Sequence, residues 1–152
     1  MKRLIAAANK GDPDAEYNLG VMYDNRIDDH GNAVGPTDDN GIPIASNRTE
    51  AMKWLRRAAE HGQPRAQMRL AELYAAGVAS DRNCGRACQW FIVAMHGLNG
   101  VHHQRARDGY DSVRSQLTTT EILAAERRAR DWERRRRVAN PAAVFTPLRV
   151  SR

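Results

Sequence analysis

The chain has 152 residues and a formal net charge of +6, which comes from 24 basic and 18 acidic side chains. This length is enough for one domain with its own hydrophobic core. No run of about 18 apolar residues is present, which excludes a membrane-spanning helix. The opening sequence MKRLIAAANKGDP reaches polar Asn9 and Lys10 too soon for a secretory leader. We therefore expect a cytoplasmic protein without membrane insertion.

The first expected elements are helices over residues 2–10 and 13–24. Asp12 is the expected N-cap of the second helix, and Pro13 suits its first position because a helix start needs no N–H there. Residues 25–47 then interrupt the helical pattern with a segment rich in Asp, Asn and Gly. The sequence around Asp39, Asn40 and Gly41 predicts a small hairpin.

The acidic residues of this insertion do not predict a calcium site. If Gly41 took the sixth position of a calcium-binding loop, Pro36 and Asn47 would take the first and twelfth positions. Both positions need oxygen-rich carboxylate ligands. We expect a solvated loop at one edge of the fold.

Two amphipathic helices follow, over residues 48–61 and 64–76. The apolar positions recur every three or four residues, as one face of a helix requires. These positions are Ala51, Trp54, Leu55, Ala58 and Ala59 in the first helix, and Ala66, Leu70, Leu73 and Tyr74 in the second. Asn47 with Glu50 resembles a capping box, and Gly62 supplies the positive φ of a helix end.

Further helices are expected over residues 84–96, 103–116 and 119–137. Thr118 and Glu121 form a second capping-box pattern at the start of the last helix. The sequence after Arg137 has two prolines and no helical period, so residues 138–152 are expected to be a flexible tail.

An internal repeat relates these helices. Residues 4–23 align with residues 55–74 at an offset of 51, so that Leu19 falls on Leu70 and Tyr23 on Tyr74. Downstream the offset is 36, and Trp54 falls on Trp90. The difference places an insertion of 15 residues between Tyr23 and Ala51. The underlying period lies in the range of α/α solenoids, whose helix pairs bury their apolar faces against neighbouring pairs.

The repeated residues resemble the Sel-one-like repeat family, a relative of the tetratricopeptide repeat. The matching pieces are Ala15-Leu19-Gly20-Met22-Tyr23 with Ala51-Trp54-Ala58-Ala59-Gly62, and Ala66-Leu70-Ala71-Leu73-Tyr74-Gly77 with Ala87-Trp90-Ala94-Gly97. The resemblance covers residues 4 to 97. It implies an all-α fold, a short right-handed superhelix of about two to three antiparallel helix pairs that binds proteins or peptides. It implies no catalytic activity and no cofactor.

The resulting organisation is one solenoid over residues 1–137. It comprises a half-repeat at 2–10, pair one at 13–61 with the insertion loop 25–47, pair two at 64–97 and a degenerate capping pair at 103–137. By analogy with tetratricopeptide arrays, the first helix of each pair lines a concave face. The expected protein-binding residues on that face are Asp14, Tyr17, Val21, Asp24, Arg65, Met68, Glu72, Arg105 and Asp108. Their mixture of apolar and charged groups suits an amphipathic peptide of unknown identity, and no small-molecule substrate.

The arginine-rich sequence RRARDWERRRR offers an alternative function. Arg134, Arg135, Arg136 and Arg137 could contact nucleic acid or another polyanionic surface. The interleaved Glu126, Asp131 and Glu133 and the helix C-terminus favour a solvated capping face, so nucleic acid is the less favoured partner.

The sequence carries no pattern typical of an enzyme. It lacks the nucleophile elbow, the phosphate-binding loop, the zinc-protease motif and the dinucleotide fingerprint. Cys84 and Cys88 lie one helical turn apart and are expected to be reduced thiols. The adjacent His102 and His103 point about 100° apart on a helix, so a zinc site with the cysteines is the minor alternative. We expect a non-enzymatic interaction module without metal or cofactor.

Overall fold

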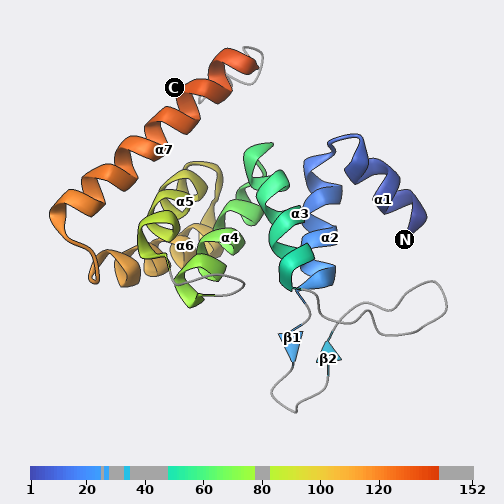
Figure 1. Ribbon diagram of the computed structural model, residues 1–152, viewed down its shortest axis with the longest axis horizontal. Coiled ribbons are helices and arrows are strands. Elements are labelled where there is room, and N and C mark those ends of the chain that lie inside the picture. The colour runs from blue at the N-terminus through green and yellow to red at the C-terminus, as the bar shows by residue number, and fades with distance from the viewer. Residues whose placement is uncertain (25, 28–32, 35–47, 78–82, 141–152) are drawn as a thin grey trace, which may run out of the picture.

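The computed structural model describes residues 1–24, 26–27, 33–34, 48–77 and 83–140. Within these residues the chain forms seven helices and one two-stranded sheet (Figure 1). The helices are α1 (Lys2–Asn9), α2 (Pro13–Tyr23), α3 (Arg48–Glu60), α4 (Pro64–Ala76), α5 (Cys84–Gly97), α6 (Gly100–Arg114) and α7 (Thr119–Ala139). The strands are β1 (Arg26–Ile27) and β2 (Ala33–Val34), and they pair antiparallel. The predicted all-α class is confirmed.

Successive helices pack side by side as in a solenoid. Helix α2 packs on α1 and α3, and α4 packs on α3 and α5. The last two helices both pack on α5, and α7 runs diagonally along the end of the row (Figure 1). The last two helices were predicted to pack on each other, but each of them packs on α5 instead. The reason is the apolar stripe of α7, in which Ala125, Ala129 and Trp132 are buried and Trp132 meets Trp90 of α5 edge-on at 5.7 Å.

The helix ends follow the predicted capping chemistry. The side chain of Asp12 accepts hydrogen bonds from the backbone N–H groups of Asp14 and Ala15, at 3.0 and 3.3 Å. Thr118 and Glu121 form the complete capping box that starts α7. Gly62 has a φ of +86° between α3 and α4, a conformation that favours glycine. The helices end close to the predicted residues, but α6 begins at Gly100 instead of residue 103, and α7 continues to Ala139.

The core consists of the predicted apolar stripes. All five stripe residues of α3 are buried, as are Ala66, Leu70 and Leu73 of α4. Tyr74 is half-buried, and its hydroxyl accepts a hydrogen bond from Arg56 at 3.1 Å. A smaller cluster of Ala8, Ala15, Leu19 and Trp54 joins α1, α2 and α3. These residues hold the helix pairs together and are therefore unavailable to a partner.

Part of the insertion and the C-terminal tail lie outside the described residues. The described part of the insertion contains the two strands, in which Arg26 pairs with Val34 and Ile27 pairs with Ala33. The sequence did not predict this pairing. The predicted hairpin at residues 39–41, the capping residue Asn47 and the tail from residue 141 all lie outside the described part of the chain. No helix among the described residues is long and apolar enough to span a membrane.

Candidate binding groove

A groove of about 220 Å³ opens where the first helix of one pair faces the first helix of the next. We call it the α2–α4–α6 groove. It is lined by Tyr17, Val21 and Asp24 from α2 and its end, by Arg65, Met68, Arg69 and Glu72 from α4, and by His102 and Arg105 from α6. Within each helix these residues are spaced by three or four positions, except that Arg69 directly follows Met68, so each helix presents one stripe to the groove.

The structure brings together seven of the nine residues expected on the concave face. Asp14 and Asp108 are absent from the lining. Asp14 accepts a hydrogen bond from Gln63 at 3.2 Å, and Asp108 accepts one from Gln104 at 2.8 Å. Arg69 and His102 line the groove but were not predicted. Whether these residues bind a protein stays a prediction.

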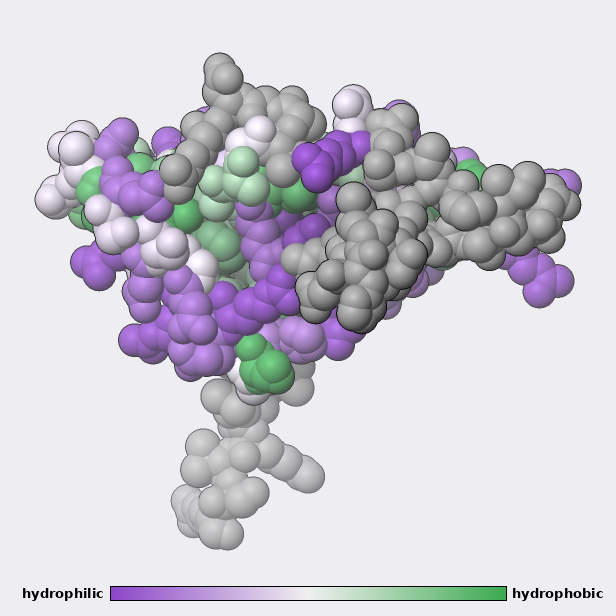
Figure 2. Space-filling model, turned by 90° about the horizontal axis from the view of Figure 1, so that it is seen from below, coloured by the Kyte–Doolittle hydropathy of each residue, from purple (hydrophilic) through white to green (hydrophobic). Residues whose placement is uncertain are grey.

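Apolar side chains form the floor and one edge of the groove. Met68 is only 6% exposed and belongs to the main core cluster, whereas Val21 is 43% exposed. Tyr17 is half-buried and packs against the same cluster. Figure 2 shows one face of the molecule, where apolar side chains lie near the middle of the body and hydrophilic side chains lie around them. Val21 and Tyr17 are therefore the more accessible apolar side chains of the groove, and Met68 is the more deeply buried one.

A chain of ion pairs crosses the groove. Arg69 donates from Nε to Asp24 Oδ2 at 2.7 Å and from a terminal nitrogen to Glu72 Oε2 at 2.8 Å. Arg105 of α6 donates from Nε to Glu72 Oε1 at 2.7 Å. Burial lowers the pKa of Arg69, but hydrogen bonds with Glu72 and Asp24 outweigh this effect and leave the pKa raised. The network thus links the end of α2 to α4 and α6, and it fixes the polar wall of the groove.

The four arginines predicted to contact a polyanion lie in different surroundings. Arg136 stacks over Trp132, with its guanidinium 5.5 Å from the ring centre, and donates to the carbonyl oxygen of His61 at 3.3 Å. Arg134 contacts Asp131 within α7. Arg135 and Arg137 are exposed. Arg136 therefore links α7 to the junction of α3 and α4, and it is the one half-buried member of the four arginines.

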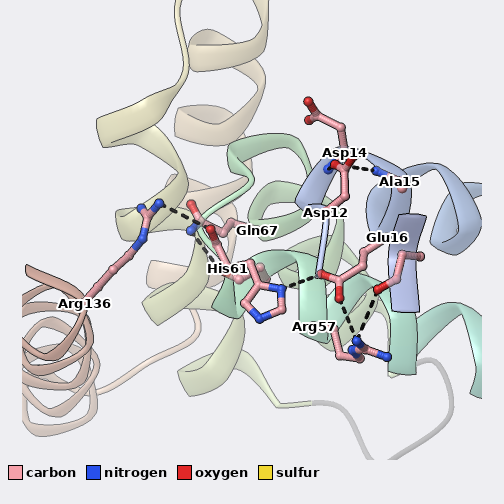
Figure 3. Close-up of polar contacts among 10 residues, drawn as sticks. Asp12, Asp14, Ala15, Glu16, Arg57, His61, Gln67 and Arg136 are labelled. Carbon is pink, nitrogen blue, oxygen red and sulfur yellow. Dashed lines mark hydrogen bonds and ion pairs between the residues drawn. The ribbon is translucent and has the colours of Figure 1, made fainter. Parts of the chain in front are cut away.

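A buried ionic cluster joins α2 to α3, and the sequence did not predict it. Glu16 is fully buried, and it points toward Arg57 and His61 (Figure 3). Its Oε2 lies 2.7 Å from His61 Nδ1, and its Oε1 lies 3.0 Å from a guanidinium nitrogen of Arg57. Oε1 is close enough to Arg57 for an ion pair, but no hydrogen-bond donor is aligned with it. At the equivalent repeat position, Gln67 is also buried and donates to the carbonyl oxygen of Ala59 at 3.1 Å.

The cysteines and histidines do not assemble into a metal site in the described part of the chain. No group of three possible ligands occurs among those residues. Cys84 and Cys88 are free thiols, as predicted. Burial raises the pKa of Cys88 to about 11, and the charge of Glu126 adds to this effect. A buried thiol with that pKa is a poor nucleophile and a poor metal ligand near neutral pH.

Comparison with known proteins agrees with this architecture. Residues 13–28, 32–63 and 64–94, just over half of the chain, match the Sel1 repeat. The structure resembles c5321, described as a protective antigen present in uropathogenic Escherichia coli strains and displaying an SLR fold (TM-score 0.67, 22% identity, 98% of this chain and 29% of that chain). It also resembles a Sel1 repeat protein from Oxalobacter formigenes (TM-score 0.56, 23% identity, 87% of this chain and 49% of that chain).

The chain thus spans less than half the length of both structures. A search of the curated proteins found no match. The repeat match agrees with the helix pairs and with the buried stripes. The chain belongs to the Sel1 repeat family.

Proposed function

We propose that this chain is a non-enzymatic adaptor that binds a segment of another protein in the α2–α4–α6 groove. Proteins of the Sel1 repeat family generally serve as scaffolds for protein–protein interactions. The observation that supports the proposal is that three helices line one groove. Apolar side chains form part of its lining, and ion pairs between the helices form its polar wall.

The size of the groove favours a peptide over a small molecule. Pockets that enclose a small ligand usually have volumes of about 300–1,000 Å³. The groove measures about 220 Å³ and is open to solvent, which suits one or two side chains of a longer segment. Val21 and Tyr17 offer apolar contact, and exposed Arg65 offers a charge at the rim. An amphipathic segment would use both kinds of contact.

The ionic wall supports this proposal through its effect on binding entropy. Arg69, Glu72 and Arg105 already hold one another in fixed positions before a partner arrives. A surface that is ordered in advance loses less conformational freedom on binding, so more of the contact energy appears as affinity.

The test uses peptides selected from a random display library on the immobilised chain. The groove variant combines Val21→Asp with Arg65→Glu, because both residues are exposed and their replacement leaves the core intact. Met68→Ala is unsuitable, since Met68 is buried and its truncation would destabilise the fold. The control combines Val138→Asp with Arg3→Glu, which makes the same chemical changes at exposed positions away from the groove.

We expect the selected peptides to bind the groove variant at least tenfold more weakly than the parent chain and to bind the control variant normally. Each 1.4 kcal/mol of lost contact weakens binding by about tenfold, so loss of one apolar contact and one charge contact suffices. Equal binding to all three proteins would show that the partner site lies elsewhere.

A further inference from the structure

The outer side of α7 carries a row of arginines that are exposed in the described part of the chain. Arg127, Arg130, Arg134 and Arg137 are all exposed and are spaced by three, four and three positions. This spacing keeps them on one side of a helix. The opposite side carries the buried Ala125, Ala129 and Trp132. We call these four residues the arginine stripe.

The acids interleaved in the sequence do not cover this stripe. Glu133 contacts His96 of α5, so it is directed toward the body of the protein. Glu126 is partly buried and close enough to Cys88 to raise the pKa of that thiol. Only Asp131 contacts a member of the stripe, Arg134, and both side chains are exposed to solvent. An exposed pair of this kind contributes little energy and can be replaced by a stronger acceptor.

We propose that the arginine stripe is a nucleic-acid-binding surface that contacts the phosphodiester backbone of a duplex. The four arginines extend over about 15 Å of helix at 1.5 Å per residue. Duplex DNA presents one phosphate charge for about every 1.7 Å of its axis, so a segment of this length meets several phosphates. The proposal uses a surface distinct from the α2–α4–α6 groove and does not depend on the proposed function.

The residue type suits a phosphate backbone. The basic residues of α7 are all arginine, as are most basic residues of the chain. The arginine fork binds phosphate oxygens in pairs, as it also binds carboxylates, whereas lysine acts as a point charge. Contacts between these arginines and the phosphates of the backbone carry no sequence information, so binding is expected to be independent of sequence.

The packing of α7 argues against a membrane as the partner. A helix that lies on a bilayer needs a free apolar face that enters the lipid. The apolar face of α7 is buried against α5, where Trp132 meets Trp90. Exposed Leu123 and Val138 are separated by the length of the stripe and do not form such a face.

The experiment measures binding of the full chain to a fluorescent 20-base-pair duplex of mixed sequence, by anisotropy at several salt concentrations. Four phosphate contacts predict a slope of about −3.6 for log K against log [salt], which means a loss of about 150-fold between 50 and 200 mM salt. The stripe variant carries Arg127→Gln, Arg130→Gln, Arg134→Gln and Arg137→Gln. We expect it to bind at least tenfold more weakly at low salt and to lose most of the slope.

The control variant removes the same charge from exposed positions elsewhere, with Arg3→Gln, Arg48→Gln, Arg86→Gln and Arg107→Gln. It should keep the parent slope. If the stripe variant does not fold by circular dichroism, the single changes Arg130→Gln and Arg137→Gln each should lower the slope by about 0.9.

Three results would overturn the proposal. The parent chain could fail to bind the duplex at 50 mM salt. The control variant could lose binding as much as the stripe variant, which would assign the effect to net charge alone. The chain could bind vesicles containing phosphatidylserine and not the duplex, which would make α7 a membrane contact.

Discussion

Replacing Glu16 by Gln is expected to lower the free energy of unfolding by about 2 kcal/mol. Glu16 is fully buried between α2 and α3 and faces two basic side chains, Arg57 and His61 (Figure 3). A hydrogen bond to a charged group contributes about 1.5–3 kcal/mol, and the loss of one member of a buried ion pair costs about 3–5 kcal/mol.

The loss of unfolding free energy caused by Glu16→Gln should lie toward the lower end of these ranges. Arg57 and His61 are 38% and 45% exposed, so both can regain water when the carboxylate is lost. Gln also keeps the shape of Glu16 and can retain one hydrogen bond to His61. For a chain of this size, about 2 kcal/mol corresponds to a fall in Tm of about 4–8 °C.

The assay is urea denaturation followed by circular dichroism, with a thermal melt as the second measurement. Asp131→Asn is the matched control, because Asp131 forms an i,i+3 pair with Arg134 within α7 and both side chains are exposed to solvent. Such a pair is worth less than about 1 kcal/mol. If Glu16→Gln melts within 1 °C of Asp131→Asn, the buried cluster does not stabilise the fold and the reasoning fails.

Three further predictions concern the packing around α5. Gly109→Ala should lower the free energy of unfolding in urea by about 1–2 kcal/mol, because a Cβ at Gly109 would lie 2.4 Å from Cζ of buried Phe91. Gly85→Ala should be neutral or stabilising, because the atom nearest to its Cβ would be the flexible end of Arg128. Cys88 should resist a thiol reagent in the folded chain at pH 8 while Cys84 reacts, as peptide mass spectrometry can measure, because Cys88 is buried and has a pKa of about 11. The same raised pKa means that unfolded chains release this proton first, so stability should fall from about pH 9 to about pH 11, and Cys88→Ala should remove that part of the fall. Equal labelling of both thiols, or destabilisation by both glycine changes, would contradict these expectations.

Much of the fold could be predicted because helix packing depends on local periodicity. The stripes of Trp54, Leu55 and Leu70 repeat at spacings that only helices use, and Gly62 and Pro64 mark a helix boundary by backbone geometry. The placement of α7 was not predictable in this way. Its Trp132 needed a partner, and the sequence does not say that this partner is Trp90 of α5.

The lining of the groove was predicted where it followed from helix periodicity alone. His102 was missed because the predicted helix began one residue after it, whereas α6 begins at Gly100. Arg69 was missed because its role depends on contacts with Asp24 and Glu72. In the sequence, Glu16 looks like any exposed acid in a helix, because its burial depends on Arg57 from the next helix. The one sequence feature that could have indicated a buried polar position is Gln67, the polar residue at the equivalent place in the next repeat.

The most direct test of the central claim is a nuclear magnetic resonance titration of the ¹⁵N-labelled chain with one of the selected peptides. If the α2–α4–α6 groove is the binding site, the largest amide shifts will fall at Tyr17, Val21, Glu72 and Arg105, and those of α7 will change little. Shifts concentrated on α7, or on the outer side of α3 and α5, with the groove amides unchanged, would contradict the account.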